Sequence, residues 1–243
     1  MTRAPPVRGD APTASQVTRL YMAPGTCARV AAIGLFEADV PFEAELVRFM
    51  AGEHRSPAFL ALNPLGKVPA LLIDGSVIVE NTAIVRYLAR RFPGAALMPV
   101  VANDLDDARQ VADLCYCAAT LHPIVTRIRI PPLFARTPEA QASVYEVAVE
   151  AMVQSLAMAE RRLTEGPWWY GESWSLMDAY LNWVWFRITG AGFNPDPFPA
   201  LSDHDRRMAE RAAVRRAVDL EAALDARLEA AGLRFTPPGP PRR

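Results

Sequence analysis

Cys27 is the first residue whose type and position suggest chemistry. It follows the turn sequence Pro24-Gly25-Thr26 and opens a predicted helix. The free N–H groups and the positive dipole end at a helix N-terminus favour a thiolate, which is the reactive form of cysteine. A free cysteine is also commonly a small buried apolar residue. Position alone therefore leaves a thiol site and a core residue both open.

The Val68-Pro69 pair at the head of a predicted strand is a second candidate. A cis peptide bond at this proline would turn the N–H and C=O groups of Val68 outward, where they could pair with a peptide-like ligand as an added strand. Most X-Pro bonds are trans, so an ordinary strand start is the alternative. Lys67, which directly precedes this pair, is the only lysine in the chain.

Glu80-Asn81-Thr82 lies where a predicted strand ends and a helix begins. A helix N-terminus can hold a carboxylate, and Glu80 beside it can hold an ammonium group. Together they would bind the zwitterionic head of an amino acid. The alternative interpretation is a plain N-cap without a ligand.

Composition limits the kind of protein that carries these residues. The chain has 243 residues, of which 51% are apolar and 22% charged, which is enough for a buried core in one large or two ordinary domains. A net charge of −1 gives no reason to expect nucleic acid or a membrane surface as a partner, and no apolar run is long enough to span a bilayer. The three cysteines are too few for a disulfide framework, which favours a reducing, cytoplasmic location.

The first part of the chain alternates strand-like and helical segments in the order β-α-β-α-β-β-α. The expected elements are strands over 18–22 and 43–49, helices over 27–38 and from Ser56, and two strands over 68–73 and 76–80. Asp74-Gly75 between the last two strands is a strong hairpin signature. Asn81 or Thr82 is expected to cap the following helix, which should end at Pro93-Gly94.

The second part of the chain reads as helix only. A long helix is expected over 104–130 with a kink at Pro123, and Thr137-Pro138 should start another that runs to about Thr164. Ser175 to Asp178 form a capping box before an apolar run, and amphipathic segments continue from Leu201 to Leu233.

This change of pattern predicts two domains, 18–94 and 105–235, with a linker over 95–104. The flanking segments 1–17 and 236–243 are rich in proline and lack periodicity, so we expect both to be disordered.

Taken together, these segments resemble the glutathione S-transferase superfamily from about Thr18 to Leu233. The resemblance is carried by LYMAPGTCARVAAIGLFE, FLALNPLGKVPALLIDGSVIVENTAIVRYLARRFP, the Leu-His pair at 121–122, SLMDAYL and FPALSDHDRRMAERAAVRRAV, in this order. The Pro-Gly-x-Cys start resembles the bacterial beta class. The resemblance implies a thioredoxin-like N-terminal domain of the α/β type followed by an all-α helical-bundle domain, a homodimer, and glutathione as co-substrate.

The resemblance also implies roles for residues of the first domain. Cys27 matches the beta-class cysteine that faces the glutathione sulfur. Val68 matches the residue whose backbone pairs with the cysteinyl part of glutathione, and Pro69 matches the family's cis-proline. Glu80 matches the acid that contacts the γ-glutamyl group. Asn81 stands where the family usually has the serine that binds the γ-glutamyl carboxylate, and Lys67 belongs to the same glutathione-binding segment.

In the second domain, His122 matches the beta-class histidine that points back toward the thiol. Without the resemblance it would be assigned to a satisfied helix position next to a kink. Asp178 matches the helix-capping acid that is tied to folding. The chain also departs from the beta class: the lysine after the second strand has no counterpart in Met50–Glu53, and Cys115 replaces an asparagine that some beta enzymes use across the dimer.

The other histidines, arginines and cysteines are assigned to structural or solvent-exposed positions. His54 and His204 lie in polar sequence and are expected to be solvated. Arg127 and Arg129 could meet an anionic substrate, but a solvated surface is the favoured interpretation. Cys115 and Cys117 are two residues apart on a helix and cannot share a face, so no metal site is predicted and both are assigned to the core or to a pocket lining.

The wall of a pocket for the second substrate is expected on the helical domain. All five tryptophans lie between 168 and 185, and most are expected in the core, with one or two at the pocket. Tyr116, Ile124 and Ile128 are the residues predicted to form the wall beside His122.

The sequence therefore predicts a bacterial detoxification enzyme that conjugates the glutathione thiolate to small apolar electrophiles, with thiol–disulfide exchange through Cys27 as a further reaction. Thr26, Cys27, His122 and the helix N–H groups are predicted to lower the pKa of the glutathione thiol. Two alternatives stay open: a catalytically weak binding or regulatory relative, and a specialised glutathione-dependent etherase or dehalogenase.

Overall fold

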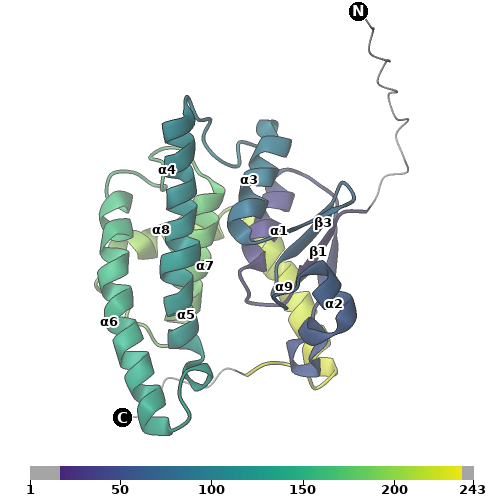
Figure 1. Ribbon diagram of the computed structural model, residues 1–243. Coiled ribbons are helices and arrows are strands. Elements are labelled where there is room, and N and C mark those ends of the chain that lie inside the picture. The colour runs from purple at the N-terminus through teal and green to yellow at the C-terminus, as the bar shows by residue number, and fades with distance from the viewer. Residues whose placement is uncertain (1–16, 237–243) are drawn as a thin grey trace, which may run out of the picture.

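A computed structural model describes residues 17–236, which form a sheet-containing part and a helical part (Figure 1). The segments predicted to be disordered, 1–17 and 236–243, lie outside the described residues except for Val17 and Thr236. Within 17–236, no helix is both long and apolar enough to cross a membrane.

The sheet-containing part has the order predicted from the sequence, β-α-β-α-β-β-α. Its elements are β1 (Arg19–Met22), α1 (Ala28–Glu37), β2 (Glu43–Leu46), α2 (Pro57–Leu62), β3 (Ala70–Ile73), β4 (Ser76–Val79) and α3 (Asn81–Arg91). The strands are ordered β2-β1-β3-β4, with β1 parallel to β2 and antiparallel to β3, and β3 antiparallel to β4. This is the predicted thioredoxin-like arrangement.

The two faces of the sheet pack against different helices because side chains alternate along a strand. Leu20 and Met22 of β1 enter the main core, whereas Tyr21 packs with the smaller cluster that includes Phe59 of α2. Helix α1 lies between the sheet and the helical part, and every residue from 28 to 35 is buried (Figure 1). Its mostly small and aliphatic side chains fit this enclosed position.

Two local predictions differ in outcome. Asp74 and Gly75 join β3 to β4 with φ values of +49° and +75°, as a two-residue hairpin turn requires, so the hairpin is confirmed. The predicted cap of α3 is wrong, because Glu80 occupies the N-cap position and no side chain caps the helix. The Asn81 amide is used elsewhere: its Nδ2 donates to the Cys27 carbonyl at 2.8 Å and joins α3 to the start of α1.

The helical part begins after residue 103. Its helices are α4 (Asp104–Cys115), α5 (His122–Arg129), α6 (Pro138–Leu163), α7 (Leu176–Thr189), α8 (Pro199–Ala209) and α9 (Ala212–Ala230). The predicted cap at Thr137 is confirmed, since its hydroxyl accepts a hydrogen bond from the Ala140 N–H at 3.3 Å.

The predicted long helix is interrupted one turn earlier than expected. A π-helical turn over Tyr116–Leu121 separates α4 from α5, directly before Pro123. A proline inside a helix has no N–H to donate and displaces the carbonyl of the preceding turn, so the disturbance falls on the N-terminal side of the proline.

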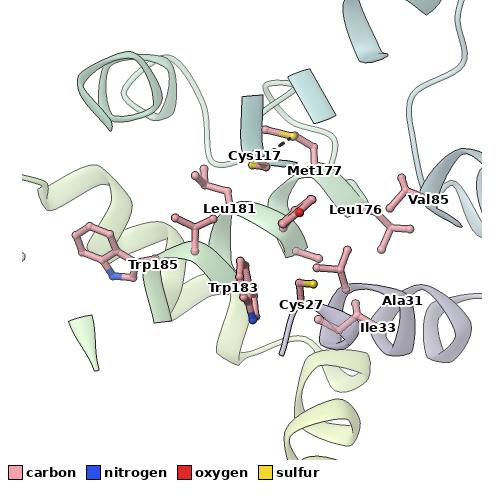
Figure 2. Packing of buried hydrophobic residues seen from close by; sticks show 14 of the residues in the cluster. Cys27, Ala31, Ile33, Val85, Cys117, Leu176, Met177, Leu181, Trp183 and Trp185 are labelled. Carbon is pink, nitrogen blue, oxygen red and sulfur yellow. Dashed lines mark hydrogen bonds between the residues drawn. The ribbon is translucent and has the colours of Figure 1, made fainter. Parts of the chain in front are cut away.

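Helix α7 is the centre of the helical core. Ser175 and Asp178 form the predicted capping box, and the buried Asp178 also accepts from the Trp169 N–H at 2.7 Å and lies 3.1 Å from Nε2 of His204. His204 is fully buried, so its predicted solvation is wrong: it serves as a partner of the Asp178 carboxylate. Figure 2 shows Trp183 of α7 on the side of Cys27, whereas Met177 lies beside Cys117, with the two sulfur atoms 4.0 Å apart.

Candidate functional site

A cavity of about 530 Å³ lies between the sheet-containing part and the helices α5 and α7. It is lined by residues from the starts of α1 and α3, from the loop before β3, and from one wall of the helical part. All eight residues predicted for the site contribute to its lining: Thr26, Cys27, Lys67, Val68, Pro69, Glu80, Asn81 and His122.

Cys27 lies at the N-terminal end of α1 but is only 8% exposed. Its Sγ is 3.7 Å from the Val68 carbonyl oxygen, to which the thiol donates. Burial raises the pKa of the Cys27 thiol to about 12; Glu80 also raises it, and Arg187 and Lys67 only partly offset these effects. The expectation of a thiolate at this helix end therefore does not hold, because burial outweighs the effect of the helix N-terminus.

The turn before Cys27 is fixed by contacts on both sides. The Thr26 hydroxyl donates to the Ala23 carbonyl at 2.6 Å, and Nε1 of Trp183 donates to the Gly25 carbonyl at 3.2 Å. Gly25 has a φ of +70°, and a Cβ there would lie 2.8 Å from Nη1 of Arg187. Glycine is thus required both by the backbone conformation and by the guanidinium that lies beside it.

The Val68-Pro69 peptide bond is cis, as the sequence suggested. The Val68 carbonyl accepts a hydrogen bond from the Cys27 thiol. The Val68 N–H makes no backbone hydrogen bond within the described residues. The side chain of Lys67 is exposed at the cavity, and the Lys67 carbonyl accepts from Nδ2 of Asn63 at 2.7 Å. This contact holds the loop that presents Val68.

Glu80 is exposed at the cavity in an unusual backbone conformation, with φ +68° and ψ +123°. Non-glycine residues rarely occupy positive φ, and such residues gather at functional sites. Asn81, in contrast, is buried, and its Oδ1 has no hydrogen-bond partner among the described residues.

His122 reaches the cavity from α5. Its Nδ1 lies 3.1 Å from the Tyr180 hydroxyl, and its ring packs on Trp183 with centroids 4.5 Å apart. Burial, together with the positive charges of Lys67 and Arg187, lowers the pKa of His122 to about 4, so the ring is neutral at pH 7. Tyr180, which the sequence assigned with its aromatic neighbours to the core, is also part of the cavity lining.

The helical wall differs from the prediction. Tyr116, Ile124 and Ile128 do not line the cavity, and the apolar wall is formed by Ala118, Val125, Ile130 and Phe134. At 100° per residue, positions three and four after His122 share its face, whereas Ile124 and Ile128 point elsewhere. The π-helical turn also changes the helical phase before His122, so regular helix spacing cannot be used to place Tyr116 relative to His122.

The arginines of the wall divide into two kinds. Arg127 is exposed, as expected, but Arg129 is only 9% exposed, so the prediction of a solvated side chain is wrong for it. Arg187, which sequence reasoning did not single out, also lines the cavity and is partly buried. It lies one helical turn after Trp183 on α7, and only the contact with Gly25 reveals its position.

Similarity to known proteins agrees with this geometry. Residues 16–90 match a family model described as the N-terminal domain of glutathione S-transferase. The glutathione S-transferase GstA of Escherichia coli O157:H7 is 31% identical over 206 residues, which cover 84% of this chain and 98% of that protein.

Two solved structures are similar along almost their whole length. A glutathione transferase homologue from Sulfitobacter, solved with bound glutathione, has a TM-score of 0.72 and 27% identity, covering 89% of this chain and 99% of that one. A bacterial beta-class enzyme from Sphingomonas chungbukensis has a TM-score of 0.72 and 28% identity, covering 84% and 98%.

Proposed function

The chain belongs to the glutathione S-transferase superfamily and is a glutathione transferase, and we propose that it conjugates the glutathione thiolate to small apolar electrophiles in the cavity lined by Cys27 and His122. The convergence of the eight predicted residues on this one cavity, from three separate segments of the first half of the chain and from α5, is the observation that carries the proposal.

Glutathione is proposed to lie along the sheet side of the cavity. The unpaired N–H of Val68 is available to the cysteinyl carbonyl, as in strand addition. The exposed Glu80 carboxylate is available to the γ-glutamyl ammonium group, and the backbone N–H groups at the start of α3 to its carboxylate. Lys67 supplies a positive charge at the same wall.

In the proposed reaction, the sulfur of glutathione forms a bond to an electrophilic carbon, the leaving group departs with the bonding electron pair, and the thiol proton goes to solvent. The site must stabilise the thiolate at neutral pH. A reduction of the thiol pKa by two units corresponds to about 2.7 kcal/mol. The N–H groups of α1, the Cys27 thiol and the cationic Lys67 and Arg187 are the groups that favour a negative sulfur there.

Cys27 is proposed to act as a thiol that donates a hydrogen bond, since burial keeps it protonated. The thiol donates to the Val68 carbonyl, and rotation about its χ1 would direct it to the sulfur of glutathione. Thiol–disulfide exchange through Cys27 would need its thiolate, and burial disfavours that form. Conjugation is therefore the better supported reaction. A specialised ether-cleaving or dehalogenating reaction would use the same site and differ only in the electrophile.

A thermal shift, an activity assay and one variant test this proposal. Glutathione at millimolar concentration should raise the melting temperature of the protein by mass action. Conjugation of 1-chloro-2,4-dinitrobenzene, followed by its absorbance change, should exceed the rate with free glutathione alone, and Glu80→Gln should weaken glutathione binding. A thermal shift or turnover above the uncatalysed rate would support the proposal. The absence of both would refute it. Arg109→Met, on α4 outside the lining of both cavities and with a largely exposed side chain, is a surface control.

A further inference from the structure

Three arginines, Arg29, Arg129 and Arg187, line the cavities beside the turn at Gly25, and of these only Arg29 forms an ion pair among the described residues. Oε2 of Glu221 accepts from Nε and Nη2 of Arg29 at 3.1 and 2.5 Å, in a pair that is buried on both sides. Arg129 and Arg187 have no carboxylate within ion-pair distance among residues 17–236, so their positive charges are not compensated by a direct partner.

Arg187 is held at the rim of the glutathione site. Its Nη1 occupies the space that a Cβ on Gly25 would need, and the side chain lines both the cavity described above and a second cavity of about 670 Å³ that adjoins it. Burial and the neighbouring Arg129 and Arg29 lower the pKa of Arg187 to about 10, and Glu221 only partly offsets these effects. The guanidinium thus remains charged at neutral pH in a place that disfavours charge.

Arg129 lies beside the same boundary between the two cavities. Its Nη1 donates to the Gly190 carbonyl at 3.1 Å, but its Nε is buried without a hydrogen-bond partner, and the residue is only 9% exposed. Leaving a buried donor on a cation unpaired is costly, and Arg187, whose charge interacts with that of Arg129, lines the same two cavities, so this boundary is suited to an anion.

The nearby carboxylates compensate these arginines only in part: Glu221 favours the charged form of Arg187 without an ion pair to it, and its Oε2 accepts from Arg29. Asp225 in the second cavity is paired with Arg234 at 2.9 Å, and Oε1 of Glu221 has no hydrogen-bond partner. Glu80, the acid of the first cavity, lies at the start of α3 and belongs to the proposed glutathione wall.

Apolar side chains also line the boundary between the two cavities. Phe49 and Ile130 line both cavities, and Phe134 lines the first. The arginines come from α5 and α7, whereas the groups proposed for the two ends of glutathione come from the sheet-containing part. A ligand at this boundary would therefore meet an apolar surface and a pair of guanidinium groups next to the reacting sulfur.

We propose that Arg187 and Arg129 form an anion subsite for the second substrate, and that the electrophiles of this enzyme are apolar, typically aromatic, molecules that carry a carboxylate. This inference rests on the proposed conjugation for its chemistry, but the subsite itself is a binding property. A planar guanidinium matches a carboxylate with two parallel hydrogen bonds, and the apolar walls accommodate the rest of the molecule.

The test compares 4-chloro-3,5-dinitrobenzoate with its neutral methyl ester. With either compound the glutathione sulfur bonds to the ring carbon that bears chlorine, and chloride leaves with the electron pair. Each kcat/KM is divided by the rate constant of the uncatalysed reaction, which corrects for the different reactivity of acid and ester. The wild type should favour the carboxylate by about tenfold or more, as expected for charge-assisted hydrogen bonds.

Single substitutions show which arginine is responsible for the preference for the carboxylate over the ester. Arg187→Met should lower kcat/KM for both compounds, because Arg187 also favours the glutathione thiolate. The loss should be greater for the acid, so that the corrected ratio comes to within about threefold of unity, and Arg129→Met should lower the ratio in the same direction. Arg129→Met carries the test alone if Arg187→Met does not fold. Arg109→Met should keep the wild-type ratio. A wild-type ratio near unity, or an equal loss for acid and ester in Arg187→Met, would overturn the subsite and leave the proposed conjugation intact.

A binding measurement separates this inference from the proposed function. Isothermal titration calorimetry with 3,5-dinitrobenzoate, which has no leaving group, should give about tenfold tighter binding than its methyl ester, and Arg187→Met should abolish the difference. Such binding without any conjugation would support the anion subsite and refute the proposed reaction. Equal binding of acid and ester would refute the subsite.

Discussion

At Cys27 two opposing effects act on one thiol. The N-terminal end of α1 favours a negative sulfur, but this effect is modest and screened, whereas near-complete burial removes the solvation that a thiolate needs. The net result is a pKa of about 12. A cysteine in this state is a weak nucleophile but a usable hydrogen-bond donor, and the structure gives it an acceptor in the Val68 carbonyl.

This assignment predicts how Cys27 variants behave. Cys27→Ala should lower kcat/KM for conjugation by about 10- to 100-fold, the range expected when a hydrogen bond to a charged acceptor is lost. Cys27→Ser keeps a donor and should stay within a few fold of the wild type. Mass spectrometry of protein incubated with oxidised glutathione at pH 7 should find little adduct on Cys27. A stoichiometric adduct together with an inactive Cys27→Ser enzyme would identify Cys27 as a nucleophile.

His122 provides a pH-dependent prediction. The native chain keeps the ring neutral down to about pH 4, whereas the ordinary pKa of histidine is 6.5. Between these values the unfolded chain binds more protons, so the free energy of unfolding falls as the pH is lowered from 6.5 toward 4, by at most about 1.4 kcal/mol per pH unit.

Urea unfolding at pH 7 and pH 5 checks this effect. The wild type should lose about 1–2 kcal/mol more of unfolding free energy than His122→Gln between the two pH values, because the variant has no titrating ring at this position. Substitution of the exposed Arg127 is the control and should leave the pH dependence unchanged. Equal pH dependence in wild type and His122→Gln would show that the ring is not held neutral by its surroundings.

At the scale of elements, α7 connects folding to the site. Its N-terminal end is anchored by Asp178, which accepts hydrogen bonds from the backbone N–H groups of Ser175 and Trp169, and which is fully buried. One and a half turns later Trp183 holds the Gly25 carbonyl, and Arg187 follows on the same side. A shift of α7 would therefore displace the contacts that fix the turn before Cys27.

Asp178→Ala should be far more destabilising than loss of the capping hydroxyl alone. Removal of the carboxylate leaves several buried donors, including Nε2 of His204, without an acceptor, and should cost about 3 kcal/mol or more of unfolding free energy. Ser175→Ala should cost about 1 kcal/mol. Chemical unfolding of the two variants measures the difference, and similar losses would mean that Asp178 acts only as part of the cap.

The sequence was informative wherever a local signal determines the backbone. The Asp74-Gly75 hairpin, the Thr137 cap and the capping box at Ser175 all depend on residues close in the chain, and each is confirmed. The thioredoxin-like order followed from such signals together with the resemblance to a known family.

Features set by distant contacts were not predictable in this way. The Asn81 amide gives up the capping position because the Cys27 carbonyl, 54 residues away, accepts from it. His204 is buried by its contact with Asp178, and Arg129 by contacts with the end of α7. Tyr116 lies in the π-helical turn before Pro123, which shifts its phase relative to His122. Ile124 and Ile128 follow that turn and lie two and six residues after His122, so even regular helix spacing excludes them from its face.

At the scale of the whole molecule, the family resemblance predicts a homodimer. The described surface exposes several large apolar side chains, including Met50, Leu65 and Leu105. Light scattering should give twice the chain mass of 26.7 kDa. Charged substitutions at these positions, one at a time, should weaken association where the side chain lies in the interface, because desolvating a charge there is unfavourable. A monomeric wild type at micromolar concentration would contradict the prediction.

The two parts of a single chain are also joined through a buried charge pair. Arg29 of α1 and Glu221 of α9 are 192 residues apart, and both side chains are almost fully buried, with Arg29 lying 4.0 Å from the centroid of the Phe186 ring. Because α9 packs against α1, the last helix of the chain covers the first, and the sheet-containing part cannot unfold without exposing helical core. We therefore expect a single cooperative unfolding transition.

Removing one partner of the Arg29–Glu221 pair should lower the free energy of unfolding strongly, whereas replacing both partners by apolar residues should not. Glu221→Gln leaves a buried guanidinium unpaired and should lower the free energy of unfolding by about 3–5 kcal/mol, but the double variant Arg29→Met/Glu221→Leu should recover most of that loss, because apolar side chains of similar volume need no compensation. The exposed pair Arg19–Glu43 is the matched control, and Glu43→Gln should cost less than about 1 kcal/mol. If Glu221→Gln cost no more than Glu43→Gln, or if the double variant were as unstable as the single one, the pair would not couple the two parts of the molecule. Chemical unfolding followed by tryptophan fluorescence, which reports on the helical part, and by circular dichroism, which reports on both parts, would measure these values and show whether the transitions coincide.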